Sequence, residues 1–241
     1  MRCGLTWATK AKKSYPETDT SGQFWRSTML DMDSRLRVAR GIAKTETQAS
    51  IQVFQILKRR GHPEAPPPTI SDGWGGIDQA MVEVYGVIPE YRDRGRPPTC
   101  KRAGSDWQYV QMVKQRDEHG KLQGVKLRVM LGSKQAAIAL LGKSTAYIER
   151  SNLTSRLFNG RQVRKTLAFS KSVDDYRASA TWEDCCYNLA RPHKSLRLPL
   201  RYALPQKWLP RTPAMAAGLT NRIWTVKELL TTLPLPRGIN T

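Results

Sequence analysis

The chain is short of acidic residues, of cysteine motifs and of long apolar runs, and each shortage excludes a class of protein. Only 20 of its 241 residues are Asp or Glu, against 40 Lys or Arg, which gives a formal net charge of +20. No two of its four cysteines are separated by two to four residues, so the zinc-knuckle pattern is missing and we expect reduced thiols. No apolar run approaches the ~18 residues of a membrane helix, and the start lacks a signal segment. We therefore expect a cytoplasmic protein with no membrane partner.

Positive charge is the strongest feature that the chain does have. A field of this size attracts polyanions and speeds encounter with them. The basic residues are spread over the whole sequence rather than gathered in one segment, which favours nucleic acid over a membrane surface. A hydrophobic content of 39% suits one soluble domain with extensions, or two small domains.

The order of local patterns predicts an α/β fold. Residues 24–32 and 35–42 are β-like runs joined by Asp33-Ser34, which predicts a hairpin. A helix is expected from the capping residue Thr45 to Gly61, and a short strand follows that ends at Asp72. Glycines then allow a tight turn into another helix. Strand, strand, helix, strand, helix is typical of α/β architecture.

The sequence also suggests how the chain is divided. Residues 1–22 lack periodicity and are expected to be a remnant or a disordered lead-in to a main domain at 23–198. Within that domain, about 86–142 is interpreted as an insertion built around a β-hairpin, and it starts with a basic loop that we expect to contact DNA electrostatically. Residues 199–241 form a Pro-rich, loosely packed tail with a short terminal helix.

Two motifs place carboxylates where phosphate chemistry could use them. Ser71-Asp72-Gly73-Trp74-Gly75 puts an acid at a strand end, and Tyr147-Ile148-Glu149-Arg150-Ser151-Asn152-Leu153 puts one in the first turns of a basic helix. Carboxylate oxygens suit Mg²⁺ or Mn²⁺, which can act on a nucleic-acid phosphate. Simpler readings remain open: Asp72 as a turn residue or helix cap, Glu149 as a helix N-terminal charge, and Trp74 as a core residue.

These motifs, with Val163-Arg164-Lys165-Thr166-Leu167-Ala168-Phe169-Ser170-Lys171-Ser172, resemble the bacterial transposases of the insertion-sequence-one type. Tyr187-Asn188 followed by Arg191-Pro192-His193 is similar to a motif of the wider DDE transposases and integrases. The resemblance covers roughly residues 23–230. It implies a ribonuclease-H-like mixed sheet flanked by helices, and metal-dependent cleavage and strand transfer of DNA.

The same resemblance implies a site and marks a departure from it. In the family, two metal ions sit between two Asp and one Glu; Asp72 matches the second acid and Glu149 the third. The first acid belongs to an Asp-Glu-x-Trp segment, and here Gly4-Leu5-Thr6-Trp7 has Gly4 in its place. We therefore expect an N-terminally truncated or decayed copy with impaired catalysis. Asp31 is a candidate for a surrogate ligand.

The expected partners are DNA, both insertion-sequence ends and target, and further copies of the chain on that DNA at the nucleoid. The predicted DNA contacts are Arg150, Asn152, Arg156, Arg161, Arg164, Lys165 and Lys171. A solvated helix face is the competing interpretation for Asn152 and Arg156, and a core or capping role for His193. Two rival functions stay open: a non-enzymatic DNA-binding remnant that regulates transposition, and a general nucleic-acid-binding protein without ancestral chemistry.

Overall fold

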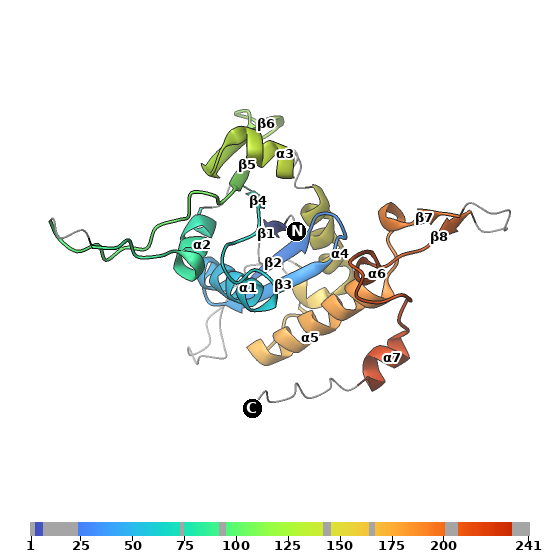
Figure 1. Cartoon of the computed structure of the whole chain (residues 1–241). Coiled ribbons are helices and arrows are strands. Elements are labelled where there is room, and N and C mark those ends of the chain that lie inside the picture. The colour runs from blue at the N-terminus through green and yellow to red at the C-terminus, as the bar shows by residue number, and fades with distance from the viewer. Residues whose placement is uncertain are drawn as a thin grey trace.

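A computed structural model describes residues 3–6, 24–72, 75–91, 95–141, 146–163, 167–200 and 207–232. Its centre is a six-stranded mixed sheet with helices on both faces (Figure 1). The strand order is β3-β2-β1-β4-β5-β6, in which β1, β4 and β5 are parallel and the other neighbours are antiparallel. The α/β prediction is confirmed. Among the described helices, none is long and apolar enough to cross a membrane.

The first half of the main domain folds as its local patterns predict. The hairpin of β2 (Trp25–Asp31) and β3 (Arg37–Ala43) lies at one edge of the sheet. Helix α1 (Glu46–Arg60) begins after Thr45, whose side chain accepts a hydrogen bond from the backbone N–H of Gln48, and it ends at Gly61. Strand β4 (Thr69–Asp72) and α2 (Ile77–Tyr85) follow.

The lead-in assigned to residues 1–22 is wrong for residues 3–6. They form β1 (Cys3–Thr6), which lies between β2 and β4 in the middle of the sheet. Gly4 is in register with Leu30 on one side and with Ile70 on the other. A four-residue strand is too short to show a two-residue period, and its hydrogen bonds are made with strands far away in sequence.

The interpretation of residues 86–142 as an insertion is also wrong. Strand β5 (Tyr109–Arg116) pairs in parallel with β4, so it is an integral strand of the main sheet. Strand β6 (Leu122–Leu131) completes the predicted hairpin and forms the other sheet edge, and α3 (Lys134–Leu141) follows it. The hairpin pattern reveals only the local β5–β6 pairing, because the β4–β5 pairing joins residues about forty positions apart.

The two faces of the sheet bury different layers. Helices α1 and α2 cover one face, where Met29, Phe54, Met81 and Tyr109 belong to the largest core cluster. Side chains of opposite parity point to the other face, where Leu30 packs with Ile148 of α4 (Ala146–Phe158). Helix α5 (Val173–Cys185) lies on this second face as well and packs on Ile42 through Val173 and Ala180.

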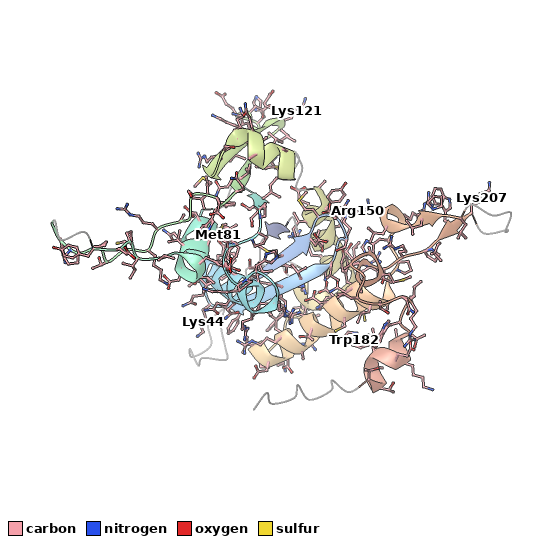
Figure 2. The ribbon with its side chains drawn as sticks, viewed as in Figure 1. Lys44, Met81, Lys121, Arg150, Trp182 and Lys207 are labelled. Carbon is pink, nitrogen blue, oxygen red and sulfur yellow. The ribbon has the colours of Figure 1, made fainter. Side chains whose placement is uncertain are left out.

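The C-terminal region contains more secondary structure than a loose tail. A 3₁₀ turn, η1 (Gly160–Gln162), follows α4, and a π-helical turn, η2 (Cys186–Ala190), extends α5. After η3 (Lys194–Leu196), a small hairpin pairs β7 (Leu198–Pro199) with β8 (Trp208–Leu209). Helices α6 (Pro213–Ala216) and α7 (Val226–Thr231) end the described chain, and α7, the predicted short terminal helix, begins with a capping box of Thr225 and Glu228. The β5–β6 and β7–β8 hairpins project from the body, and they carry the labelled Lys121 and Lys207 (Figure 2).

Candidate catalytic site and nucleic-acid interface

Asp72 is the last residue of β4, at the carboxyl edge of the parallel strands. Its register partner on β5 is Met112, and it shares a sheet face with Ile70, two residues earlier. Ile70 and Met112 are buried together in one apolar cluster. Helix α2 begins after Gly76, whose φ of 107° lies in the left-handed region that favours glycine. Gly73 and Trp74 of the motif lie outside the described residues.

Glu149 is brought to the same edge by α4. The preceding residue, Ile148, is 2% exposed and packs on Leu30, which fixes the start of the helix against the sheet. The Glu149 carboxylate lies 2.6 Å from the ammonium group of Lys114. Lys114 lies two residues beyond Met112 on β5, on the face that Asp72 shares. Asp72 and Glu149 therefore lie on the same face of the sheet, near the carboxyl ends of β4 and β5.

The backbone of Gly4 lies where a third acid would complete this arrangement, but glycine has no side chain that could bind a metal ion. Because Gly4 is in register with both Leu30 and Ile70, it belongs to the face on which α4 packs. Asp72 lies two residues beyond Ile70, which is about 7 Å along the strand. An acid at position 4 would thus stand near both Asp72 and Glu149, but glycine offers no ligand.

Asp31 is not brought together with the other two acids. It is in register with Cys3 of β1, which is itself in register with Thr69, the first residue of β4. Asp72 lies three residues further on, about 10 Å away along the strand direction. The Asp31 carboxylate instead accepts hydrogen bonds from the backbone and hydroxyl of Ser34 and so closes the β2–β3 turn. Asp31 is therefore a turn residue near the amino ends of β1 and β4, whereas Asp72 lies at the carboxyl end of β4.

The residues present do not fit a two-metal centre. The centre that the family resemblance implies uses three carboxylates that converge on two metal ions. Within the described ranges, no three His, Cys, Asp or Glu side chains gather as a metal-binding group. One of the two acids at the edge is paired with a lysine ammonium group, which supplies positive charge where a cation would bind.

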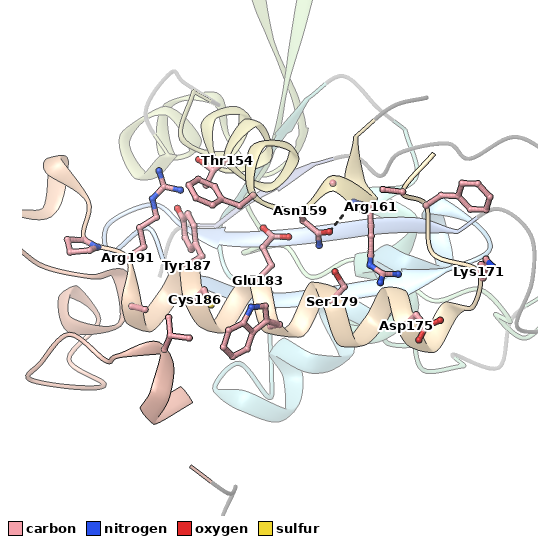
Figure 3. Close-up of a pocket in the computed structure, with 18 residues that line it drawn as sticks. Thr154, Asn159, Arg161, Lys171, Asp175, Ser179, Glu183, Cys186, Tyr187 and Arg191 are labelled. Atoms are coloured by element: carbon pink, nitrogen blue, oxygen red, sulfur yellow. Dashed lines mark hydrogen bonds between the residues drawn. The ribbon is translucent and has the colours of Figure 1, made fainter. Parts of the chain in front are cut away.

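Three of the predicted DNA contacts lie at two separate places. Arg150 is exposed on α4, close to the sheet edge just described. Arg161 and Lys171 instead line a pocket of about 930 Å³ between the end of α4, residues 167–171 and α5 (Figure 3). Phe158, Phe169 and Trp182 also line this pocket. Arg164 and Lys165 lie outside the described residues.

A buried ionic cluster, which the motifs did not predict, joins the second-face helices to the edge hairpin. Glu183 of α5 is 7% exposed and accepts hydrogen bonds from Arg26 at 3.0 Å, Ser155 at 2.6 Å and Gln162 at 2.6 Å, and from Arg37. Asp184 pairs with the same arginines and with Arg40. We call Arg26, Arg37, Arg40, Glu183 and Asp184 the paired cluster.

The sequence did contain a signal for this cluster. The sequence predicts a helix over Asp174–Leu189 with Tyr176, Ala180 and either Cys186 or Tyr187 at inner positions, and Glu183 falls on the face of Tyr176 and Ala180 at helical spacing. A carboxylate on an inner face needs charged or hydrogen-bonding partners. Burial alone would raise the pKa of Glu183, but the guanidinium groups of Arg26 and Arg37 and the Ser155 hydroxyl lower it to about 2.

The Tyr187-Asn188 motif has a structural task at the edge of the sheet. The Asn188 side chain accepts a hydrogen bond from the backbone N–H of Arg37 at 3.0 Å and donates one to its carbonyl at 3.1 Å. It thereby satisfies exposed backbone groups of the edge strand β3. Tyr187 packs with Leu30 and Ile148, and His193 lies edge-on against it with ring centroids 4.7 Å apart.

Comparison of the chain with protein-family models, with curated proteins and with solved structures found no match.

Proposed function

We propose that this protein is a DNA-binding protein of ribonuclease-H-like fold, derived from a DDE transposase, with an impaired catalytic site. The observation that supports this most is topological. Three consecutive antiparallel strands precede two parallel ones in the order β3-β2-β1-β4-β5, with α1 and α2 as the crossover helices. This is the arrangement that a ribonuclease-H-like sheet requires. It accounts for an acid at the end of β4 and another on the helix that covers β1.

The charge of the chain supports a nucleic-acid partner. A net charge of +20 is concentrated on exposed lysines and arginines, several of them on α4 and on the projecting β5–β6 hairpin. Such a surface binds the phosphate backbone with little dependence on base sequence. The same charge opposes self-association in free solution, so we expect copies of the chain to assemble on DNA rather than without it.

A non-enzymatic regulator is the second candidate, and two observations at the catalytic edge favour it. Position 4 has no side chain to bind metal, and Lys114 neutralises Glu149. A chain that retains the fold and the DNA-binding surface but lacks one acid could compete with intact subunits for the same DNA ends.

Restoring the missing acid tests both candidates. Gly4→Asp would place a third carboxylate in register between Leu30 and Ile70. We expect the natural chain to show no strand transfer of a pre-cut DNA end in Mn²⁺, and Gly4→Asp to show measurable transfer. Transfer should disappear in Gly4→Asp/Asp72→Asn and in Gly4→Asp/Glu149→Gln, whereas Gly4→Asn should match the natural chain.

The proposal would be wrong in different ways for different results. Robust transfer by the natural chain would refute the impaired site. Tight DNA binding without transfer in Gly4→Asp would favour the regulator. Absence of DNA binding in low salt would refute both candidates.

A further inference from the structure

We propose that Arg35, Arg150 and Arg191 form one binding site for a backbone phosphate of DNA, beside the imidazole of His193. This inference rests on the DNA binding proposed above, and it identifies where one phosphate is held. We call Arg35, Arg150 and Arg191 the unpaired cluster. Two of the three arginines, Arg35 and Arg191, and His193 are not among the DNA contacts that the motifs predict.

The three arginines come from segments far apart in sequence. Arg35 lies in the turn between β2 and β3 and has a positive φ of 63°. Its guanidinium carbon lies 3.2 Å from the ring centroid of Tyr147, in the first turn of α4. Arg150 follows three residues later on the same helix, so it lies on the same side one turn on. Arg191 follows η2, and its guanidinium stacks over Phe158 at 4.2 Å.

Tyr187 and His193 hold fixed positions next to α4, the helix that carries Arg150. Tyr187 is 5% exposed and packs on the core residues Leu30 and Ile148, and the half-buried His193 ring is held against it at 78° between the ring planes. The backbone N–H of His193 donates to the carbonyl of Arg211 at 2.9 Å. The ring therefore has a fixed position, which pre-organises any ligand contact it makes.

The positive charges of these arginines act on the His193 ring. Burial lowers the pKa of His193, and the positive charges of Arg191, Arg37, Arg150 and Arg35 lower it further, to about 4. The imidazole is therefore neutral at pH 7, surrounded by cations from the β2–β3 turn, β3, α4 and the segment after η2. Of these cations, Arg37 alone belongs to the paired cluster.

The unpaired cluster has no counter-charge in the part of the chain that the structure describes. There, no carboxylate forms an ion pair with Arg35, Arg150 or Arg191, although Arg26, Arg37 and Arg40 each have one. The Nε2 atom of His193 and the Nε and Nη1 atoms of Arg35 are buried without a hydrogen-bond partner among the described residues. Buried polar atoms are nearly always satisfied, which points to an external acceptor.

A phosphate diester fits this set of groups better than a carboxylate. Guanidinium groups donate parallel hydrogen bonds that match phosphate oxygens, and several can bind one phosphate at once. The exposed Lys194 and Arg197 continue the positive surface along the chain toward the β7–β8 hairpin. A polyanion can follow such a path, whereas a lone small anion would gain from one position only.

DNA affinity as a function of salt tests the assignment. Binding of a short fluorescein-labelled duplex is measured by anisotropy, from about 50 to 200 mM salt. Arg35→Gln and Arg191→Gln should each weaken binding roughly tenfold, and each should reduce the log–log salt slope by about 0.9. The matched control is Arg59→Gln, which removes the same charge from an exposed position at the end of α1. Arg35→Lys keeps the charge and should retain most of the affinity.

The His193 imidazole provides a readout that a merely structural role would not change. A bound phosphate stabilises the protonated ring, so the NMR titration midpoint of His193 should rise when the duplex is added. If Arg35→Gln and Arg191→Gln behave like Arg59→Gln while the natural chain binds DNA, this inference is overturned and the proposed function stands. If inorganic phosphate moves the midpoint and DNA does not, the site binds free phosphate and the backbone assignment is wrong. If the natural chain binds no DNA, the proposed function itself fails.

Discussion

The paired and unpaired clusters lie on the same face of one sheet, and both are built from arginine. The arginines of the paired cluster form buried ion pairs that join helices to the sheet, whereas those of the unpaired cluster are the proposed phosphate site. In the paired cluster, Arg26 and Arg37 are 6% and 2% exposed and are neutralised by two adjacent acids of α5. In the unpaired cluster, Arg150 and Arg191 are exposed and have no acid partner among the described residues, and the neighbouring His193 is neutral at pH 7. The chain has only 20 acidic residues, and two of them are placed together inside. In these two clusters, the acids accompany the most buried arginines, and the exposed Arg150 and Arg191 have no acid partner among the described residues.

Removing Glu183 should have the largest effect, because it breaks the paired cluster at its centre. Glu183→Gln keeps the shape but leaves Arg26 and Arg37 buried with less compensation. We expect a loss of about 3–5 kcal/mol in the free energy of unfolding, measured by urea denaturation. Glu118→Gln, in the exposed β5–β6 turn, is the matched control and should change stability by less than about 0.5 kcal/mol. Equal stability of the two variants would contradict a structural role for the paired cluster.

Acid should weaken the paired cluster in a defined pH window. The pKa of Glu183 is lowered from 4.5 to about 2, so the unfolded chain takes up the proton first as the pH falls. Its stabilisation is therefore complete above about pH 4.5 and is lost as the pH approaches 2, on the order of 3 kcal/mol in total. Urea denaturation at several pH values checks this. Glu183→Gln should lack the loss between pH 4.5 and 2.

The unpaired cluster contributes to an earlier part of the same pH profile. The pKa of His193 is lowered from 6.5 to about 4, so its contribution is present above about pH 6.5 and is lost as the pH falls toward 4. The two clusters can therefore be told apart by the window in which each loses stability. A profile that is flat from pH 6.5 to 4 would contradict the lowered pKa of His193.

The helices and the local hairpins could be predicted from the sequence, but the order of the strands in the sheet could not. The β2–β3 hairpin, α1 and α2 carry local signals: alternation, a capping threonine, a glycine stop and helical spacing. Strand β1 and the place of β5 in the main sheet depend on pairing between distant segments, which no local pattern encodes. A prediction from local periodicity therefore identifies helices and strands but not which strands pair in the sheet.

The candidate site shows the same limit. The motifs locate Asp72 and Glu149, and the sheet brings both to one edge. Lys114 could not be predicted as the partner of Glu149, because it lies on a strand that the sequence assigned to an insertion. Likewise, Arg191 lies two residues before His193, but Arg35 lies 156 residues before Arg191, and only the packing of α4 and η2 on the hairpin brings Arg35 to this region.

Substituting one arginine from each cluster should separate their roles. Arg26→Gln removes a buried partner of Glu183 and Asp184, so we expect it to cost about 2 kcal/mol, less than Glu183→Gln because Arg37 remains. Arg191→Gln should change the free energy of unfolding by less than about 0.5 kcal/mol, since none of the described acids is paired with Arg191. Both are measured by urea denaturation beside the DNA titrations. A stability loss in Arg191→Gln as large as that in Arg26→Gln would mean that the unpaired cluster is structural.

The exposed pair of Lys114 and Glu149 should have the smallest effect, and it provides a third case for the comparison. Its side chains are 44% and 46% exposed, so water screens the attraction and the pair contributes at most about 1 kcal/mol. Lys114→Met should therefore leave the free energy of unfolding within about 0.5 kcal/mol of the natural value.

The same change removes the cation beside Glu149 and should strengthen Mn²⁺ binding several-fold in the Gly4→Asp background, measured by calorimetry, because the metal no longer competes with an ammonium group. Lys134→Met, at the exposed start of α3, removes an equal charge and should leave Mn²⁺ binding unchanged. If both lysine substitutions strengthened Mn²⁺ binding equally, net charge rather than the pair at the sheet edge would control metal affinity.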